Sequence, residues 1–387
     1  MREPCHQSTT PSSPNTTDQF SLPGTKELEV SLFGLGIGEC VVLHVGSGSW
    51  VIIDSCVDRA TGNPVALDYL HSLGVDVARA VKRVIITHWH DDHARGIARI
   101  LKAAESADLV CSAALCTNEF QTLLGMGMST PLQETGVVEF GQAFEVLKQR
   151  PNAARVQAIS PIWAQESKVI LRTSDASIHS LAPSDATLTL VYHEIGEALR
   201  GTASGRRRLV AQTANEVSIV MWVEFGSIRC LLGGDLESQG GDRTGWLAIV
   251  DSLTRPPGKA LVFKVPHHGS ETAYEPRIWS ELLESPAYAM LSPWSLGNKA
   301  IPTRSDCARI LQHTQHLYQT TPTPKRKATV ASPSVKKLLR RIAPDLRDLE
   351  GPMGHVRIRA CDHDTIGVQL FGRAHKVMLT DSTGPQE

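Results

Sequence analysis

Four strand-like runs in this 387-residue chain end in acidic or histidine side chains, and this arrangement constrains the fold more than any other feature. Asp54 closes WVIID, a histidine-rich segment follows VIIT, Asp235 closes CLLGGD, and His267 follows VFKVP. Short runs of β-branched and large apolar residues indicate buried strands. Polar residues at the carboxyl ends of such strands lie where open α/β folds build their sites. The sequence therefore predicts an α/β fold with a site at one sheet edge.

The remaining periodic segments predict strands in each half of the chain, with helices after each half. This order favours two sheets with helices packed outside them. Residues 107–215 give a less regular pattern of short strands and loops. The predicted elements are three strands within 28–56, a helix at 64–73, a strand at 81–87, a helix at 94–105, two strands within 215–237, a strand within 260–270 that ends in two histidines, a strand at 286–293, a helix at 304–318, and closing strands at 354–359 and 365–371.

Composition and charge are those of an ordinary globular protein. Hydrophobic residues make up 41% and charged residues 20%, and the net charge is −1. Such a balance gives no overall attraction to nucleic acid or membrane, so binding of a polyanion requires a local basic patch. The candidate clusters are at 206–208, 325–327, 336–337 and 340–341. We expect a disordered tail at 1–25 and a single domain at 26–387, with an exposed basic insertion at about 320–345.

The chain carries no signal for export or membrane insertion. Its first 20 residues lack an apolar core of the kind found in secretory signals, and its apolar runs are too short to span a bilayer. The eight cysteines form no CxxC pair, which is typical of reduced thiols in the cytoplasm. We therefore expect a cytoplasmic protein without membrane contact. Binding to a separate protein is an alternative that no motif in the sequence indicates.

The segment THWHDDH, residues 87–93, holds three histidines and two aspartates behind an apolar strand. Imidazole nitrogens and carboxylate oxygens are the ligands of catalytic zinc, and also of manganese or iron at related sites. The spacing of His88 and His90 puts both on one side of an extended segment, so they can share one ion. Asp92 and His93 can then face a second ion. Asp235, after two glycines, is the candidate to bridge the two ions.

Each of the other strand-end residues has two interpretations. One of His267 and His268 is expected to bind metal, while its neighbour acts as a hydrogen-bond donor or acid. Asp54 is expected to orient a ligand histidine from behind rather than bind metal itself. Lys264 either steadies oxygens of the substrate or is a solvated residue on an edge strand. Asp235 is a ligand or, alternatively, a turn carboxylate.

These motifs resemble the metallo-β-lactamase fold superfamily, in which WVIID, THWHDDH, LLGGD and the strand-final histidines occur in the same order. The pairing of LLGGD with FKVPHHGS most resembles its ComEC-like branch, whose type member degrades one DNA strand during uptake. The resemblance covers roughly residues 28–310 and leaves out the membrane part of that type member. It implies an αββα sandwich of two mixed sheets, with helices on both outer faces and a dinuclear metal site at one edge.

The resemblance also implies a role for each motif residue. His88 and His90 would hold one ion, and Asp92, His93 and His268 the other. Asp235 would bridge the ions, and His267 would lie beside the substrate. The resemblance therefore implies that His268, rather than its neighbour, is the ligand of this pair.

The sequence departs from the superfamily pattern at two places. Many members carry a further histidine ligand before the bridging aspartate, and the chain offers only His179 and His193 in that interval, neither of which we expect to bind metal. The branch often has a histidine before a proline after its last strand, where this chain has Ile301 before Pro302. This second departure leaves the substrate contacts at that edge open.

The expected activity is that of a metal-dependent hydrolase, in which hydroxide activated by two divalent ions attacks the substrate. Zn²⁺ is the expected ion and Mn²⁺ the alternative. Asp92, His267 and Lys264 are the candidate catalytic residues. Phosphodiesters of nucleic acids or nucleotides are the first substrate class, which would make the protein a nuclease or nucleotide phosphodiesterase. Carboxyl esters, lactones and thioesters form the alternative class, and a non-catalytic binding protein is a third interpretation.

Overall fold

The computed structural model of the chain describes residues 20–36, 38–116, 135–150, 160–200, 214–238, 241–296, 299–323 and 353–378. The four basic clusters and most of the predicted basic insertion lie outside these residues. So does most of the predicted N-terminal tail. Within the described part, Ser21 already contacts the domain, because its carbonyl accepts a hydrogen bond from Arg359 at 2.5 Å.

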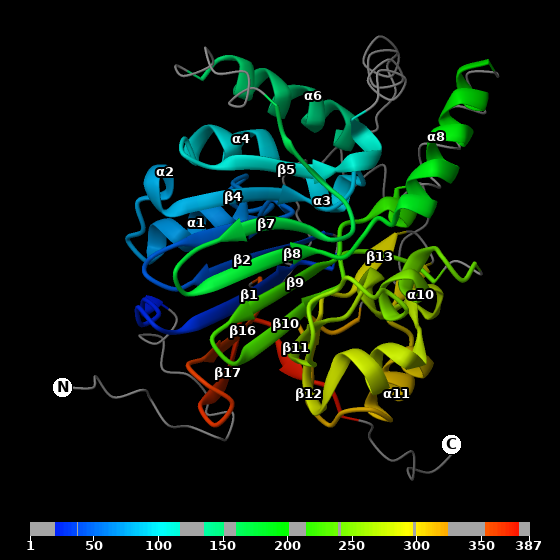
Figure 1. Cartoon of the computed structure of the whole chain (residues 1–387). Coiled ribbons are helices and arrows are strands. Elements are labelled where there is room, and N and C mark those ends of the chain that lie inside the picture. The colour runs from blue at the N-terminus through cyan, green and yellow to red at the C-terminus, as the bar shows by residue number, and fades with distance from the viewer. Residues whose placement is uncertain are drawn as a thin grey trace, which may run out of the picture.

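Two mixed sheets form the centre of the molecule, each with eight strands among the described residues (Figure 1). Sheet 1 has the order β17-β16-β1-β2-β3-β4-β5-β6, and sheet 2 the order β18-β15-β12-β11-β10-β9-β8-β7. The strands of sheet 1 are β1 (Leu28–Gly34), β2 (Glu39–Val45), β3 (Trp50–Ile53), β4 (Val81–Ile86), β5 (Asp108–Ser112), β6 (Ile162–Ala164), β16 (Gly354–Ala360) and β17 (Ile366–Phe371). Those of sheet 2 are β7 (Lys168–Arg172), β8 (Ala176–Ser180), β9 (Met221–Phe225), β10 (Ile228–Leu232), β11 (Ala260–Lys264), β12 (Leu283–Leu291), β15 (Leu317–Gln319) and β18 (His375–Lys376).

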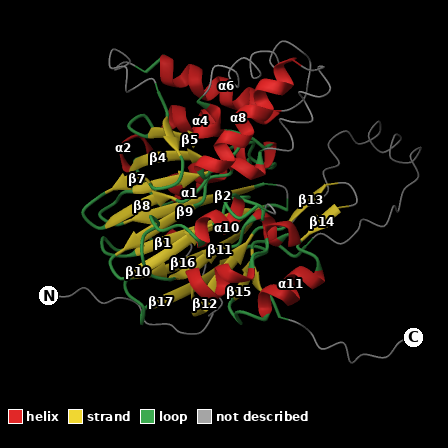
Figure 2. Cartoon of the chain, turned by 45° about the vertical axis from the view of Figure 1, so that its right-hand side comes forward, coloured by secondary structure: helices red, strands yellow, loops and turns green. Residues whose placement is uncertain are grey.

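Helices cover both outer faces of this pair of sheets. In Figure 1, α4 and α6 lie on the outer side of sheet 1, and α10 and α11 on the side of sheet 2. A separate hairpin of β13 (Trp294–Leu296) and β14 (Lys299–Ile301) extends from the body in Figure 2. The helices are α1 (Val65–Ser72), α2 (Val77–Ala80), α3 (Asp91–Ala94), α4 (Ile97–Ala103), α6 (Thr135–Lys148), α8 (Asp185–Arg200), α10 (Gly245–Val250) and α11 (Arg304–Leu311), with short helical turns at Ala113–Leu115, Asn215–Val217, His267–Gly269, Glu271–Ala273 and Ile278–Leu282.

The side-chain alternation of the strands explains why the central strands are mostly apolar. In β2, Val41 and Leu43 pack into the core between the sheets, whereas Cys40 and Val42 face the helices of sheet 1. Successive strand residues point to opposite faces, so a strand covered on both faces is apolar at most positions, and its buried polar residues need partners. The sequence run therefore specifies a central strand of a layered fold. This αββα arrangement is the metallo-β-lactamase fold that the motifs predicted.

Two predicted helices are shorter than the sequence pattern suggested. The helix expected at 94–105 is split into α3 and α4 at Gly96, whose φ of 86° lies in the left-handed region. The helix expected at 304–318 ends at Leu311. The residues after it turn and form β15, because Leu317 pairs with Ala289 of the parallel strand β12.

The irregular region 107–215 contains two helices, α6 and α8, that the sequence reading missed. Helix α8 buries Leu188, Val191 and Ile195 at helical spacing. These side chains join the apolar cluster on the outer, helix-covered face of sheet 1. Among the described residues, no helix is both long enough and apolar enough to cross a membrane. The described cysteines are all free thiols, and most of them are buried.

Candidate metal centre

The carboxyl ends of β3, β4, β10 and β11 lie together at one edge of the two sheets (Figure 1). Strands β3 and β4 are parallel neighbours in sheet 1, and β10 and β11 are parallel neighbours in sheet 2. The two edges are joined where the Ile219 amide donates to the Thr87 carbonyl at 3.1 Å. The four strand ends singled out in the sequence therefore meet, although they come from distant parts of the chain.

One group of possible ligands combines both sheets. His88 and His93 follow β4 and are fully buried, and Asp235 follows β10 with 2% of its surface exposed. The Nε2 atom of His93 lies 3.2 Å from Asp235 Oδ2, and Nε2 of His88 lies 4.0 Å from the same oxygen. These three side chains place their ligand atoms within 4.8 Å of one another. Such a set of buried donors has the size and chemistry of a divalent cation site.

A second group lies directly beside the first and shares its residues. The Nε2 atom of His268 lies 3.5 Å from Asp92 Oδ2 and also 3.5 Å from Asp235 Oδ2. His93 Nε2 lies 3.9 Å from Asp92 Oδ2. Asp92, His93 and His268 form the second set of ligand atoms within 4.8 Å of one another. Asp235 Oδ2 thus lies between the two groups, which is the place a bridging carboxylate requires.

Asp54 and Thr87 fix the proton positions of two of these histidines. Asp54 Oδ2 is 2.8 Å from His93 Nδ1, which must donate the proton, and it accepts the Thr87 hydroxyl at 2.7 Å. The single hydroxyl proton of Thr87 is used in that bond, so His88 Nδ1, at 2.9 Å, donates to the Thr87 oxygen. A neutral imidazole with its proton on Nδ1 presents a lone pair on Nε2. Both histidines therefore offer Nε2 to the site.

His268 is fixed in the same way by a backbone group. Its Nδ1 lies 2.8 Å from the Ser292 carbonyl, which can only accept a hydrogen bond. In their neutral form, the three imidazoles point lone pairs at the carboxylates of Asp92 and Asp235, and these like partial charges repel unless positive charge lies between them. Without metal, a proton on His93 or His268 supplies that charge, because the carboxylates raise the pKa of both histidines, and a divalent ion would replace the proton. The residues present therefore fit a pair of divalent ions, and these five side chains would hold them.

The pKa values of the buried histidines and aspartates also indicate that the site favours positive charge. Burial lowers the pKa of His93, but the carboxylates of Asp235, Asp54 and Asp92 outweigh it and raise this pKa well above its usual range. Burial raises the pKa of Asp235, but His93 and His268 outweigh that effect and hold it well below its usual range. The pKa of Asp92 is also lowered, because His93 and His268 outweigh the effect of burial. Both aspartates are therefore ionised at neutral pH, as metal ligands must be.

The backbone at this edge is strained at three residues in or beside the candidate metal centre. Asp54, His267 and His268 have φ angles of 57°, 45° and 55°, a region that non-glycine residues rarely adopt. Next to Asp235, Gly234 also has a positive φ, and a Cβ there would lie 2.5 Å from Ser218 Oγ. Strain of this kind persists where the surrounding structure holds a functional side chain in place. The glycine before Asp235 thus allows the close approach that the sequence predicted.

Glu39 is the residue of this site that the sequence reading missed. It opens β2, is 2% exposed, and forms a buried ion pair with Lys264. Its carboxylate oxygens lie 3.9 Å from His93 Nδ1 and 3.6 Å from His268 Nδ1. The available signal was an acidic residue at the head of the apolar run ECVVLHV. Charged residues are almost never fully buried unless they are paired.

The structure contradicts one of the two interpretations of Lys264, and the other, contact with oxygens of the substrate, stays a prediction. It ends β11, an interior strand of sheet 2, and only 2% of its surface is exposed, so it is not a solvated residue on an edge strand. Its ammonium contacts Glu39, donates to the Gly234 carbonyl at 2.8 Å, and lies 3.5 Å from Asp235 Oδ1. These protein contacts place the charge beside Asp235 Oδ1, whereas the ligand histidines lie nearest Asp235 Oδ2.

His267 faces a polar cluster beside the ligand groups. Its Nδ1 lies 2.9 Å from Glu237 Oε1 and 3.1 Å from Thr272 Oγ1, and its Nε2 lies 3.3 Å from the Asn215 amide nitrogen. Asn215 also donates to Glu237 at 3.0 Å. The imidazole is thus held at both nitrogens within a network of partly buried groups. Direct contact of His267 with substrate remains a prediction.

The other histidines of the sequence analysis occupy distinct places. His90 Nδ1 lies 3.1 Å from His88 Nε2, but among the described residues His90 belongs to none of the three groups of mutually close ligand atoms, the third of which is Glu39, Asp54 and His93. His179 lies on β8 beside Ser177 and Glu224, and His193 is exposed on α8. Within the first histidine motif, Trp89 is buried among the apolar side chains that pack sheet 1 against its helices.

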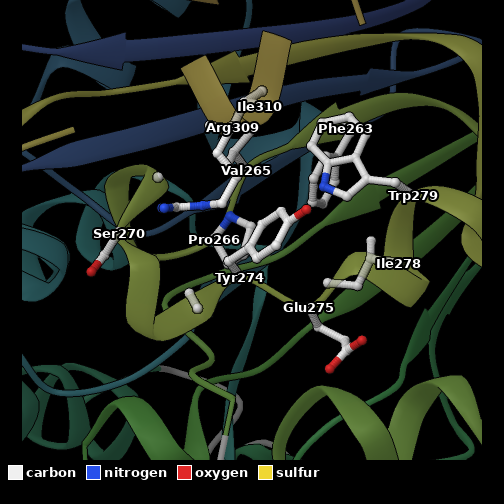
Figure 3. Close-up of a pocket in the computed structure, with 12 residues that line it drawn as sticks. Phe263, Val265, Pro266, Ser270, Tyr274, Glu275, Ile278, Trp279, Arg309 and Ile310 are labelled. Atoms are coloured by element: carbon white, nitrogen blue, oxygen red, sulfur yellow. The ribbon is translucent and has the colours of Figure 1, made fainter. Parts of the chain in front are cut away.

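The far side of the His268 turn is supported by an aromatic pocket of about 10 Å³ (Figure 3). Tyr274, Trp279 and Arg309 line it, and the Arg309 guanidinium lies 4.9 Å from the centre of the Tyr274 ring. A space of this size holds about one water molecule. None of the candidate ligands lines the pocket, but Pro266, Gly269 and Ser270 of the His268 turn do.

Comparison with known proteins agrees with this fold. The family model described as metallo-beta-lactamase superfamily matches residues 33–124, which include the first histidine motif. A search of curated proteins found no match. Among solved structures, the metallo-beta-lactamase fold protein YhfI from Bacillus subtilis is similar, with 12% identity over 61% of this chain and 69% of that chain and a TM-score of 0.32. A HARLDQ-motif mutant of a metallo-beta-lactamase from Cronobacter sakazakii shows 13% identity over 60% and 75% of the two chains, with a TM-score of 0.34.

The family-model match, the αββα sheets and the converging histidines and carboxylates support placement in the metallo-β-lactamase superfamily. The same findings support a metal-dependent hydrolase as the class of protein. The match does not extend to Asp235 or His268, which the fold alone brings to the site.

Proposed function

We propose that the protein is a phosphodiesterase that uses two divalent metal ions and acts on nucleic acid or nucleotides. The observation that carries the proposal is the shared position of Asp235 Oδ2, which lies within 4.0 Å of His88, His93 and His268. Divalent ions bound there would supply hydroxide at neutral pH and neutralise charge on the oxygens of the reacting group. Zn²⁺ is the expected ion because three imidazoles are present, and Mn²⁺ is the alternative because carboxylates accompany them.

The small number of histidines favours a phosphodiester over a carboxyl ester. The sequence between residues 94 and 235 contains only His179 and His193, and both lie away from the ligand groups. The ion beside His88 would therefore have few protein ligands and several open positions. A phosphodiester offers anionic oxygens for such positions, whereas an ester or lactone offers a neutral carbonyl. Open positions beside a cation therefore favour the charged substrate.

The chain's own residues have separable roles in this proposal. Asp92 and Asp235 hold negative charge at the two ion positions, and Asp54 with Thr87 keeps the histidines in the ligand tautomer. His268 is oriented by the Ser292 carbonyl. His267 contacts Glu237 through Nδ1 and Asn215 through Nε2, so Nε2 would have to gain a proton and leave Asn215 before it could donate a hydrogen bond to the leaving group or to a phosphoryl oxygen.

Hydrolysis assays with metal-defined protein test the proposal. Purified protein is stripped with chelator, reloaded with Zn²⁺ or Mn²⁺, and its metal content measured. It is then assayed on bis(p-nitrophenyl) phosphate, DNA, RNA and a cyclic dinucleotide, beside a lactone, a thioester and a β-lactam. We expect two ions per chain and hydrolysis of at least one phosphodiester.

Variants connect any measured activity to the site. Changing an outer-shell residue typically costs about 10- to 100-fold in metal affinity or activity. The direct-ligand variants Asp92→Ala and Asp235→Ala are therefore expected to lose about 100-fold or more in kcat/KM. His179→Ala is the control, because this histidine lies on β8 outside the site, and it should retain activity. Cleavage of lactones or thioesters alone would contradict the proposal, as would phosphodiester cleavage that survives both aspartate substitutions.

A further inference from the structure

A buried ion pair lies directly behind the shared ligand Asp235. Lys264, from sheet 2, and Glu39, from sheet 1, are each 2% exposed, and the ammonium of one contacts the carboxylate of the other. The ammonium also lies 3.5 Å from Asp235 Oδ1 and donates to the Gly234 carbonyl at 2.8 Å. Lys264 therefore holds one oxygen of Asp235 from behind, while the other oxygen, Oδ2, faces the three ligand histidines.

Glu39 is not needed to orient the histidines near it. The Nδ1 atoms of His93 and His268 already have acceptors, Asp54 and the Ser292 carbonyl, both at 2.8 Å. Glu39 lies farther from these nitrogens, and its Oε2 has no hydrogen-bond partner among the described residues. The close partner of Glu39 is Lys264. Its contribution is therefore best explained by charge.

The charge of Lys264 conflicts with metal binding unless it is balanced. In a buried site, a positive charge 3.5 Å from Asp235 competes strongly with a divalent ion for the same carboxylate and also repels the ion. Glu39 supplies a second carboxylate to the ammonium. Asp235 can then keep its own negative charge for the ions in front of it. The pair thus separates two tasks, with Lys264 orienting Asp235 and Glu39 balancing Lys264.

We propose that Glu39 is a positioning residue that sets metal affinity by keeping Lys264 from competing for Asp235. The inference depends on the metal centre but not on the choice of a phosphodiester substrate. It predicts that loss of Glu39 alone is more harmful to metal binding than loss of Glu39 and Lys264 together. A purely structural role for the pair would not produce this order.

The test measures Zn²⁺ binding by chelator competition, and the thermal midpoint of the metal-free protein, for three variants. Glu39→Gln leaves Lys264 unbalanced, so we expect Zn²⁺ affinity to fall about tenfold or more. In Glu39→Gln/Lys264→Met, both charges are gone and Asp235 has no competing cation, so affinity should return to within about threefold of wild type. The double variant is expected to fold, because replacing both members of a buried ion pair is often tolerated.

Glu29→Gln is the matched control. Glu29 is also fully buried, and its carboxylate pairs with Arg359 Nη2 at 2.7 Å. It lies near the start of β1 and belongs to no group of candidate ligands among the described residues. It should lower the thermal midpoint without changing Zn²⁺ affinity. The inference is wrong if Glu39→Gln binds Zn²⁺ like wild type, or if the double variant binds as weakly as Glu39→Gln. Failure of the wild-type protein to bind Zn²⁺ would instead overturn the metal centre itself.

Discussion

At the scale of single residues, Asp54 shows how one side chain prepares several others for metal binding. Its two carboxylate oxygens accept hydrogen bonds from the Thr87 amide, the Thr87 hydroxyl and His93 Nδ1, all between 2.7 and 2.8 Å. The residue adopts a left-handed backbone, with a φ of 57°, to reach these partners. One carboxylate therefore fixes His93 directly and His88 through Thr87.

Replacing Asp54 with Asn tests this role while leaving the left-handed backbone acceptable, because Asn tolerates that conformation well. The amide is a weaker acceptor than the carboxylate and removes its negative charge from His93. We expect metal affinity to fall about 10- to 100-fold, as for other residues that orient metal-binding histidines. Chelator competition measures this change. An affinity equal to that of wild type would contradict the orienting role of Asp54.

At the scale of elements, helix α6 is docked directly against the first histidine motif. The Gly136 amide, at the start of the helix, donates to the Asp91 carboxylate. A Cβ at Gly136 would lie 2.1 Å from the Trp89 carbonyl oxygen, so glycine is required for this approach. The helix thereby holds the motif from outside the sheet. The turn that carries His88 to His93 depends on an element that begins more than 40 residues later.

Gly136→Ala is expected to push α6 away from the motif. Overpacking of this kind costs about 1–3 kcal/mol of unfolding free energy, and metal affinity should fall as well, because the motif loses its support. Gly196→Ala in α8 is the control, since a Cβ there meets nothing within 4 Å. This control should be stabilised by roughly 0.5–1 kcal/mol, because alanine favours the helix over glycine. Urea unfolding and chelator competition report the two effects, and equal behaviour of the two variants would contradict the docking argument.

At the scale of the whole molecule, the ends of the described chain close on each other. Strand β16, near the C-terminus, pairs with β1 along its full length, from Leu28 opposite Ala360 to Gly34 opposite Gly354. His355 of β16 is buried there, stacked on Phe33 with ring centres 4.1 Å apart. Burial lowers the pKa of His355 well below its usual range, and the nearby Arg357 and Arg359 lower it further. The closing strand thus carries a histidine that must stay neutral.

This histidine makes the stability of the fold sensitive to acid. An unfolded histidine titrates near pH 6.5. Below that pH, the unfolded chain binds a proton that folded His355 does not, so unfolding becomes more favourable as pH falls. One such proton changes the unfolding free energy by up to about 1.4 kcal/mol per pH unit. The stability from this residue is therefore present above pH 6.5 and is lost progressively below it.

His355→Phe preserves the stacked ring and removes the titrating group. We expect the variant to lose less stability than wild type between pH 7.5 and pH 5.5, as measured by urea unfolding. Chelator is added to both proteins, so that the candidate ligands contribute equally. His71→Gln, on the exposed side of α1, is the control and should follow the wild-type curve. A His355→Phe curve with the wild-type pH dependence would count against this role.

Local patterns in the sequence were sufficient to predict the layered α/β fold and the strand ends that carry the polar residues. A mostly apolar strand such as β2 can be recognised from its own residues, because burial on both faces favours apolar side chains at most positions. Asp54, Asp235 and the two histidine motifs were visible for the same reason, since each interrupts a buried run. The split at Gly96 and the strand after α11 were missed, because both depend on contacts with other elements.

Only the tertiary structure decided which charges face one another. Glu39 and Lys264 lie 225 positions apart and in different sheets, so no local pattern links them. Their pairing behind Asp235, and the docking of Gly136 on Asp91, arise from the packing of sheets and helices. The sequence by itself therefore determined the kinds of residue that reach the edge of the sheets. Packing determined which of them face the metal centre and which hold it in place from behind. The reason is that a buried charged side chain is stable only beside a partner of opposite charge, and that partner comes from a distant part of the chain.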